Sequence, residues 1–286
     1  MIGKLAGLAV FLALTAAALQ MAERSSRATH VGSYEACPRR PAFAAAAQAN
    51  AQTLRTAGWS VFGRPETGWE VYVPLTAHEI GTSCAPDSDG FAAALAAWQG
   101  DHRQVGNGVM DEPTLRTLDR IWQGRRPFVA ASSHGVCPSP PAELSNAQVD
   151  EGYGGKPIQL RAGALAAYRR MVAAARADEP VLAADRRMLT IFSGYRDPAA
   201  DAARCAKDQN CNAVVRATCS AHRTGLAMDL YLGAAPGFSP DSSADPNRLY
   251  QTRSNAYLWM VGHARAFGFV NYPFEPWHWE WTGEAP

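Results

Sequence analysis

A proline-rich segment near the middle of the chain is the feature that most constrains its fold. The segment Cys137-Pro138-Ser139-Pro140-Pro141 is too rich in proline for a helix or a central strand, because proline lacks the backbone N–H that both structures use. A chain of 286 residues is also comfortable for two folded units. We therefore expect a first unit over residues 37–128, a linker over 129–143 and a second unit over 144–286.

The chain begins with an apolar segment. Lys4 precedes a long apolar stretch that ends before Glu23. This order is typical of a secretory signal, and the stretch is also close to the length that spans a bilayer. Residues 1–22 are therefore predicted to be a signal peptide or an uncleaved anchor in the inner membrane, and residues 23–36 a polar linker. Either form places the protein in the periplasm or otherwise outside the cytoplasm.

The charge balance argues against nucleic acid as a partner. The chain has 27 Lys and Arg residues against 26 Asp and Glu, a net charge of +1, and no run of basic residues. Nucleic-acid-binding proteins usually carry a concentrated basic surface. The hydrophobic fraction of 47% is ordinary for a globular protein and is enough for a sizeable core.

The cysteines indicate disulfide bonds. An even number in an apparently exported chain favours structural bridges, and no pair has the C-x-x-C spacing of a zinc knuckle or a redox site. Six cysteines allow about 15 pairings, and the sequence does not choose among them. They are Cys37, Cys84, Cys137, Cys205, Cys211 and Cys219.

The first unit is predicted to be small and mostly helical. An alanine-rich helix is expected from Pro41 to Ala57, ending at Gly58. Residues 69–74 alternate like a short strand. Two further helices carry apolar stripes, and Asp111 can cap the second of them. The stripes consist of Phe91, Leu95 and Trp98 in the first helix and of Leu115, Leu118 and Ile121 or Trp122 in the second.

These last two helices resemble the small helical peptidoglycan-binding module. The resemblance rests on the segments FAAALAAWQ and GNGVMDEPTLRTL, although Asn107 and Glu112 depart from the usual Asp and Gly. It implies that the first unit binds the glycan strands of the cell wall. The alternative is an ordinary small helical domain, because Leu and Trp stripes alone are unspecific.

The second unit mixes helices with short strands. One helix carries the stripe Leu165, Tyr168 and Val172. Another is capped by Ser254, and residues 189–192 read as a strand. The regular alternation of strand and helix that indicates a parallel sheet is missing. The predicted fold class is therefore α+β, a small antiparallel sheet flanked by helices, preceded by the small helical unit.

Two segments of the second unit carry side chains suited to a metal site. They are Ser220-Ala221-His222-Arg223-Thr224-Gly225-Leu226-Ala227-Met228-Asp229-Leu230 and Glu275-Pro276-Trp277-His278-Trp279-Glu280-Trp281. The two imidazoles of His222 and His278 and the carboxylate of Asp229 suit zinc. Three protein ligands leave a fourth position open for water.

Strand periodicity predicts which way two of these ligands face. Met228 and Leu230 point to one side of a strand, so Asp229 points to the other, polar side. In the segment 277–281 the three tryptophans share one face, and His278 lies on the opposite face together with Glu280.

His222 and Glu275 do not fit a simple strand. His222 is an odd number of residues before Asp229, so it needs a bend, which Gly225 could provide. Glu275 is also an odd number of residues from His278, so on a regular strand the two side chains would point to opposite faces. Pro276 is in addition unfavourable in an ordinary strand. We therefore expect Glu275 to approach the metal from a loop.

The two segments resemble the VanY-type family of zinc D-alanyl-D-alanine carboxypeptidases. The family pattern reads Ser-x-His-x-x-Gly-x-Ala-x-Asp followed by Glu-x-x-His, and every fixed position is present. Gly194-Tyr195-Arg196 also matches, and the likeness spans most of residues 150–286. It implies Zn²⁺ as the cofactor, held by His222, Asp229 and His278.

The resemblance also assigns roles in catalysis. Glu275 would be the general base that accepts a proton from the zinc-activated water and passes it to the leaving amine. Arg196 would bind the terminal carboxylate of the substrate and stabilise the transition state, since arginine is best suited to a carboxylate. Tyr195 and Ser220 are further candidates for substrate binding.

The implied function is removal of the terminal D-alanine from peptidoglycan stem peptides with D-Ala-D-Ala ends. Two alternatives stay open. One is an endopeptidase that cuts L-Ala-D-Glu or cross-link bonds, and the other is a non-catalytic, zinc-containing protein that binds the cell wall. No Ser-x-x-Lys motif occurs, which argues against the serine mechanism of penicillin-binding proteins.

Overall fold

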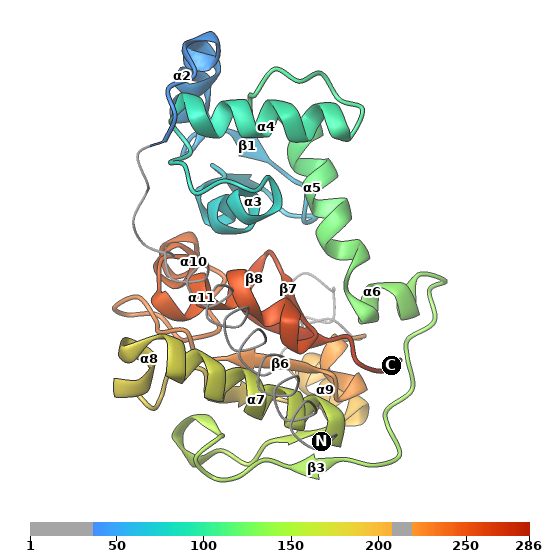
Figure 1. Cartoon of the computed structure of the whole chain (residues 1–286). Coiled ribbons are helices and arrows are strands. Elements are labelled where there is room, and N and C mark those ends of the chain that lie inside the picture. Colours follow the sequence, from blue (N-terminus) through green and yellow to red (C-terminus); the bar gives the residue numbers. More distant parts are fainter. Residues whose placement is uncertain (1–36, 208–218) are drawn as a thin grey trace, which may run out of the picture. The chain divides into compact units, whose positions relative to one another are not determined.

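The structure is a computed structural model that describes residues 37–207 and 219–286 (Figure 1). All of these residues belong to one compact unit. The predictions for residues 1–22 and 23–36 lie outside the described residues. Within residues 37–207 and 219–286, no helix combines the length and apolar character that crossing a membrane requires.

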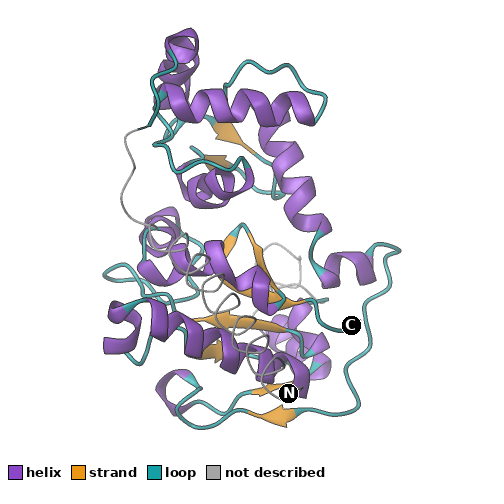
Figure 2. Ribbon diagram, in the orientation of Figure 1, coloured by secondary structure: helices purple, strands orange, loops and turns teal. Residues whose placement is uncertain are grey.

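Residues 37–128 are mainly helical (Figure 2). The elements, with η for a 3-10 helix, are η1 (Pro41–Phe43), α2 (Ala44–Thr53), β1 (Gly58–Trp59), β2 (Glu66–Thr67), η2 (Glu70–Tyr72), α3 (Val73–Glu79), α4 (Asp89–Asp101) and α5 (Glu112–Gly124). α6 (Pro127–Ser132) follows, and residues 133–144 contain no helix or strand.

The two predicted apolar stripes of this part form one core. Phe91 and Leu95 of α4 are completely buried together with Leu115 and Leu118 of α5. The predicted cap is confirmed, because Asp111 Oδ1 accepts a hydrogen bond from the backbone N–H of Thr114 at 2.9 Å and so satisfies a free donor at the start of α5.

The strand predicted for residues 69–74 is wrong. This segment forms η2 and the start of α3. Trp69, Tyr72 and Thr76 are all buried, and their spacing of three and four residues is that of one helix face. Pro74 lies in the first turn of α3, where no backbone N–H is needed. The pattern of apolar residues in this segment is therefore compatible with a helix as well as with a strand.

Residues 144–286 contain a four-stranded antiparallel sheet with the strand order β5-β6-β8-β7. The sheet strands are β5 (Ile191–Ser193), β6 (Ala227–Leu230), β7 (Phe269–Tyr272) and β8 (Glu275–Trp281), and β3 (Ser145–Asn146) pairs with β4 (Gln159–Leu160). The helices are η3 (Tyr153–Gly155), α7 (Ala162–Asp178), α8 (Pro180–Ala184), α9 (Pro198–Lys207), η4 (Ala221–Thr224), α10 (Asp245–Thr252), α11 (Asn255–His263) and η5 (Ala264–Phe267). The α+β prediction is confirmed.

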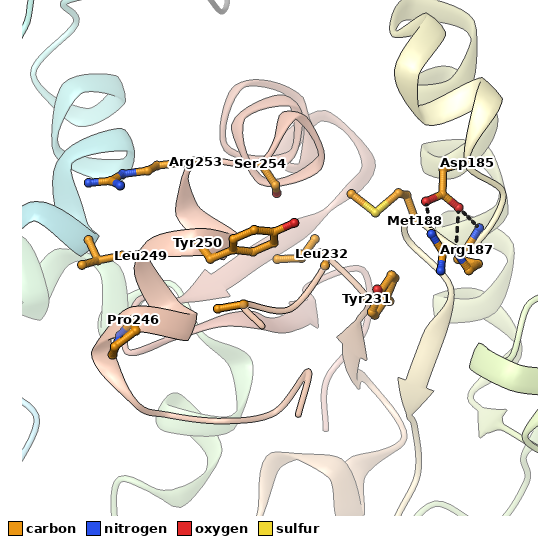
Figure 3. A pocket seen from close by; sticks show the side chains of 12 residues that line it. Asp185, Arg187, Met188, Tyr231, Leu232, Pro246, Leu249, Tyr250, Arg253 and Ser254 are labelled. Atoms are coloured by element: carbon orange, nitrogen blue, oxygen red, sulfur yellow. Dashed lines mark hydrogen bonds and ion pairs between the residues drawn. The ribbon is translucent and has the colours of Figure 1, made fainter. Parts of the chain in front are cut away.

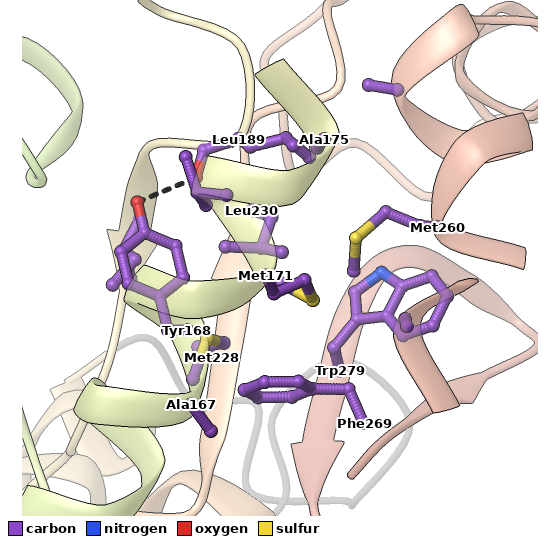
Figure 4. Packing of buried hydrophobic residues seen from close by; sticks show 14 of the residues in the cluster. Ala167, Tyr168, Met171, Ala175, Leu189, Met228, Leu230, Met260, Phe269 and Trp279 are labelled. Atoms are coloured by element: carbon purple, nitrogen blue, oxygen red, sulfur yellow. Dashed lines mark hydrogen bonds between the residues drawn. The ribbon is translucent and has the colours of Figure 1, made fainter. Parts of the chain in front are cut away.

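One face of this sheet forms the main hydrophobic core. Met228 of β6 and Trp279 of β8 pack there with Tyr168 and Met171 of α7, and Met260 of α11 contributes to the same cluster (Figure 4). Because side chains alternate along a strand, the residues between these apolar positions point to the other face of the sheet. That other face carries the candidate functional site.

The described cysteines are disulfide-bonded, as predicted. Cys37 pairs with Cys84, Cys137 pairs with Cys219, and Cys205 is disulfide-bonded as well. Cys211 lies outside the described residues. The bond from Cys137 ties the proline-rich segment to the start of the first predicted metal-binding segment, since Cys219 directly precedes Ser220.

Candidate metal centre

Asp229 and His278 lie side by side on neighbouring strands. Their Cα atoms are register partners in the antiparallel pair of β6 and β8. Met228 and Trp279, which are also register partners, face the core instead. Asp229 Oδ1 is 2.9 Å from His278 Nδ1. The facing predicted from strand periodicity is confirmed.

His222 reaches the same place from a short turn. It lies in the second position of η4, and the Oγ of the capping residue Ser220 accepts the backbone N–H of His222 at 3.3 Å. Gly225 ends the turn with φ +68°, a conformation that favours glycine, and a Cβ there would lie 3.0 Å from Leu144 Cδ2. The predicted bend at Gly225 is present and brings His222 to the face that carries Asp229.

Together these three side chains form a compact donor group. His222, Asp229 and His278 are all buried, and one ligand atom from each lies within 4.8 Å of the other two. Nδ1 of His222 donates to the carbonyl oxygen of Gly194 at 2.7 Å, which leaves Nε2 directed at Asp229 Oδ1, 3.2 Å away. Burial and the positive charge of Arg196 lower the pKa of His222 to about 4, so its Nε2 lone pair is free at neutral pH.

His278 is held from behind by a second carboxylate. Its Nε2 lies 3.3 Å from Oε1 of Glu280, which is completely buried. Burial opposes the charge of Glu280, but the nearby guanidinium of Arg126 and the hydrogen bond from His278 lower its pKa to about 2. Glu280 is therefore ionised and can accept the Nε2 proton of His278, which directs Nδ1 toward a metal.

Glu275 lies in a strand, and the prediction of a loop is wrong. It is the first residue of β8 and pairs with Tyr272 of β7, whereas the next pair is Asn271 with Trp279. The residues between, including Pro276, form a bulge with no register partner on β7. A proline is tolerated at a bulge because no ladder hydrogen bond is required of it.

Asn271 holds this bulge and was not recognised from the sequence. Its Nδ2 donates to the carbonyl oxygen of His278 at 2.8 Å and lies 3.3 and 3.4 Å from those of Pro276 and Glu275. The hydroxyl of Tyr257 donates to Asn271 Oδ1 at 3.1 Å. One buried amide therefore sets the backbone path that separates Glu275 from His278.

The residues of the donor group lie in a part of the chain that is similar to a known protein family. Residues 157–284 match the VanY family, which is described as D-alanyl-D-alanine carboxypeptidase. This part of the chain belongs to the VanY family. The matched range of this VanY domain contains every site residue predicted from the sequence. A comparison of the chain with curated proteins gave no match.

Arg196 lies at the edge of the donor group in the VanY domain. Its Nη2 is 3.6 Å from Asp229 Oδ2, and the side chain is 30% exposed. Its Nε has no hydrogen-bond partner among the described residues. Because part of the side chain is exposed, the guanidinium group can meet an anionic ligand while it stays next to the candidate metal ligands.

The other site residues predicted from the sequence have different surroundings in the VanY domain. They are Glu275, Tyr195 and Ser220. Burial raises the pKa of Glu275, as does Asp229, while His278 and Arg196 oppose this. Tyr195 is partly exposed and follows directly after Gly194, the residue that holds His222. The hydroxyl of Ser220 is engaged as the cap of η4, so the structure gives Ser220 a positioning contact with His222.

A separate surface pocket of about 620 Å³ lies beside the end of β6 in the VanY domain (Figure 3). Tyr231 and Tyr250 are among the residues that line it. Asp185 pairs with Arg187 at 2.8 Å, and Arg253 has an acidic partner too. None of the predicted site residues lines this pocket, so we treat it as distinct from the donor group.

Proposed function

We propose that the protein is a zinc-dependent D-alanyl-D-alanine carboxypeptidase that removes the terminal D-alanine from peptidoglycan stem peptides. The observation that carries the proposal is the buried donor group of His222, Asp229 and His278, which lies inside a VanY domain. The family and the disulfide bonds fit action outside the cytoplasm, where disulfides persist.

The donor group fits zinc in its chemistry. Two imidazole nitrogens and one carboxylate oxygen are common zinc ligands, and three protein ligands leave room for a water molecule and the substrate. The hydrogen bonds of His222 to Gly194 and of His278 to Glu280 fix the ring nitrogens that face the donor group. Zinc bound there would acidify a water molecule and polarise the scissile carbonyl group.

Glu275 is the proposed general base. Its carboxylate belongs to the strand that also carries His278, and its pKa is raised above the ordinary value of 4.5. A carboxylate with a raised pKa accepts the proton of the attacking water more readily and can return it to the leaving amine of D-alanine.

Arg196 is the proposed binding group for the substrate. A stem peptide ends in a free carboxylate, and arginine pairs well with such a group. Its partial exposure and its position next to Asp229 support this role. We further propose Tyr195 and Ser220 as neighbours of the bound peptide, and residues 37–128 as a module that holds glycan strands.

The test is an assay of the purified full chain with a pentapeptide ending in D-Ala-D-Ala, with and without a chelator, and with mass detection of D-alanine. We expect release of D-alanine that is lost with the chelator and restored by zinc. Glu275→Gln should keep zinc but lower hydrolysis by at least about 1,000-fold, and the exposed Glu284→Gln should match wild type. An intact pentapeptide beside cleaved sacculi would overturn the carboxypeptidase assignment and indicate an endopeptidase. Zinc binding without any cleavage would indicate a wall-binding protein.

A further inference from the structure

We infer that Arg126, which lies outside the VanY domain, is a positioning residue for the metal ligand His278 and acts through Glu280. The inference rests on the proposed zinc site. It gives residues 37–128 a role besides any binding of the cell wall, because this helical part then supplies a component of the metal centre.

The first step is the contact between Glu280 and His278. Oε1 of Glu280 lies 3.3 Å from Nε2 of His278, and Nδ1 of the same ring faces Asp229. A carboxylate that accepts the outer N–H of a metal-binding histidine fixes the ring orientation and the tautomer. The direction of the His278 lone pair therefore depends on where Glu280 is held.

The second step is that Glu280 depends on residues before the VanY domain. Glu280 is completely buried, and a buried carboxylate is stable only when it is paired and hydrogen-bonded. Arg126 supplies the charge, with Nε 2.7 Å and Nη2 2.6 Å from Glu280 Oε1. The backbone N–H of Phe128 donates to Oε2 at 3.1 Å.

Arg126 is itself held in place on two sides. Its Nη1 donates to Gln123 Oε1 of α5 at 2.6 Å, so the guanidinium is fixed relative to that helix. Its guanidinium carbon lies 4.1 Å from the ring centroid of Tyr272, the residue that pairs with Glu275. Arg126 therefore contacts both Glu280 and the β7 partner of the proposed base.

A second buried arginine joins the same two parts of the chain next to Glu275. Arg248 of α10 donates from Nε to the carbonyl oxygen of Phe274 at 2.9 Å, directly before Glu275. Its Nη1 and Nη2 donate to Glu66 Oε2 at 2.9 Å and to the Tyr72 hydroxyl at 2.6 Å. The helical part is thus linked through Arg248 to Phe274, the residue before β8, and it contacts Glu280 of β8 directly through Arg126. Only the Arg126 contact leads to a metal ligand, through Glu280.

The test measures zinc affinity of full-length variants by competition with a coloured chelator, with thermal unfolding as the check of folding. Arg126→Met should weaken zinc binding by about 10- to 100-fold. Arg126→Lys keeps the charge and should recover part of this loss. The control Arg125→Met removes the neighbouring ion pair with Glu79, which does not touch Glu280, and should stay within roughly twofold of wild type.

A double variant separates positioning from general destabilisation. If Arg126 acts through Glu280, then Arg126→Met combined with Glu280→Gln should bind zinc about as well as Glu280→Gln alone. Losses that simply add, or an Arg126→Met protein with the zinc affinity of wild type, would overturn the inference. If Arg126→Met does not fold, Arg126→Gln, which removes the charge but keeps a polar side chain, takes its place, and wild-type zinc affinity in that variant would overturn the inference.

The outcome also distinguishes this inference from the proposed function. A wild-type protein that binds zinc but leaves the pentapeptide intact contradicts the carboxypeptidase proposal, and the affinity series still decides on Arg126. A wild-type protein that binds no zinc contradicts both. Normal hydrolysis together with unchanged affinity in Arg126→Met contradicts the inference alone.

Discussion

Asp229 and His278 are register partners on adjacent antiparallel strands, and Asp229 Oδ1 lies 2.9 Å from His278 Nδ1. The geometry of this pair is therefore set by the backbone register of β6 and β8. A slip of either strand by one residue would turn its ligand toward the hydrophobic core and separate it from the ligand on the other strand. Two of the three candidate ligands are thus as rigid as the centre of the sheet, whereas His222 depends on the turn that ends at Gly225.

Replacement of His222 should remove the metal. His222→Ala deletes the Nε2 atom that faces Asp229, and two remaining ligands hold zinc much less tightly. We expect loss of stoichiometric zinc after dialysis, measured by elemental analysis. The control is His263→Ala, since His263 stacks on Trp259 away from the donor group. Undiminished zinc in His222→Ala would refute its assignment as a ligand.

Replacement of Arg196 should affect the substrate more than the metal. Arg196→Ala removes the guanidinium next to Asp229, so we expect kcat/KM for the pentapeptide to fall on the order of 100-fold while zinc content stays normal. Steady-state kinetics with released D-alanine as the readout measures this. Arg187→Ala, at a 70% exposed side chain, should behave as wild type. Equal kinetics for both variants would remove Arg196 from the site.

Asn271 should contribute to stability through the bulge that it supports. Asn271→Ala leaves buried carbonyl oxygens of β8 without their donor, and we expect a loss of about 2 to 3 kcal/mol in the free energy of unfolding. Tyr257→Phe removes only the hydrogen bond to Asn271 Oδ1 and should cost about 1 kcal/mol. Urea unfolding measures both. The role of the bulge is contradicted if the two variants lose the same amount.

The conformation of Gly225 should be needed for metal binding. Gly225→Ala forces alanine into φ +68° with Leu144 in close contact, so we expect a loss of about 1 to 2 kcal/mol and weaker zinc binding. Gly237→Ala is a matched control, because its φ is +85° but no atom lies within 4 Å of the added Cβ. It should lose stability without losing zinc affinity. Equal zinc affinity in the two variants would show that His222 does not depend on this turn.

Asp119 should make the folded protein less stable as the pH rises. Burial raises its pKa from 3.8 to about 6, although Gln123 and Arg126 oppose this. The folded state therefore binds the proton more tightly than the unfolded state, so stability falls between about pH 4 and pH 6 and then levels off. Asp119→Asn should remove at most roughly 3 kcal/mol of this dependence, and less than that because solvent screens the partly exposed carboxyl group. Urea unfolding at several pH values checks it, with the exposed Asp241→Asn as control. An unchanged pH slope in Asp119→Asn would contradict the prediction.

Local patterns in the sequence determined much of this protein. Side-chain periodicity and capping residues predicted the helices that begin after Asp111 and Ser254 and the inward direction of Asp229. The odd offset of His222 predicted the bend at Gly225. These features depend on residues a few positions apart, and the geometry of helices and strands relates such residues directly.

Other features were decided only by the tertiary structure. The bulge that keeps Glu275 within a strand depends on Asn271, and the ion pair behind His278 joins Arg126 to Glu280 across 154 residues of sequence. No local period connects such positions. Arg126 and Glu280 come into contact only when the helical part packs against β8. The buried carboxylate of Glu280 is then stabilised by the positive charge that lies nearest in space. Sequence alone therefore indicated the candidate ligands, while the fold determined which side chains hold them in place.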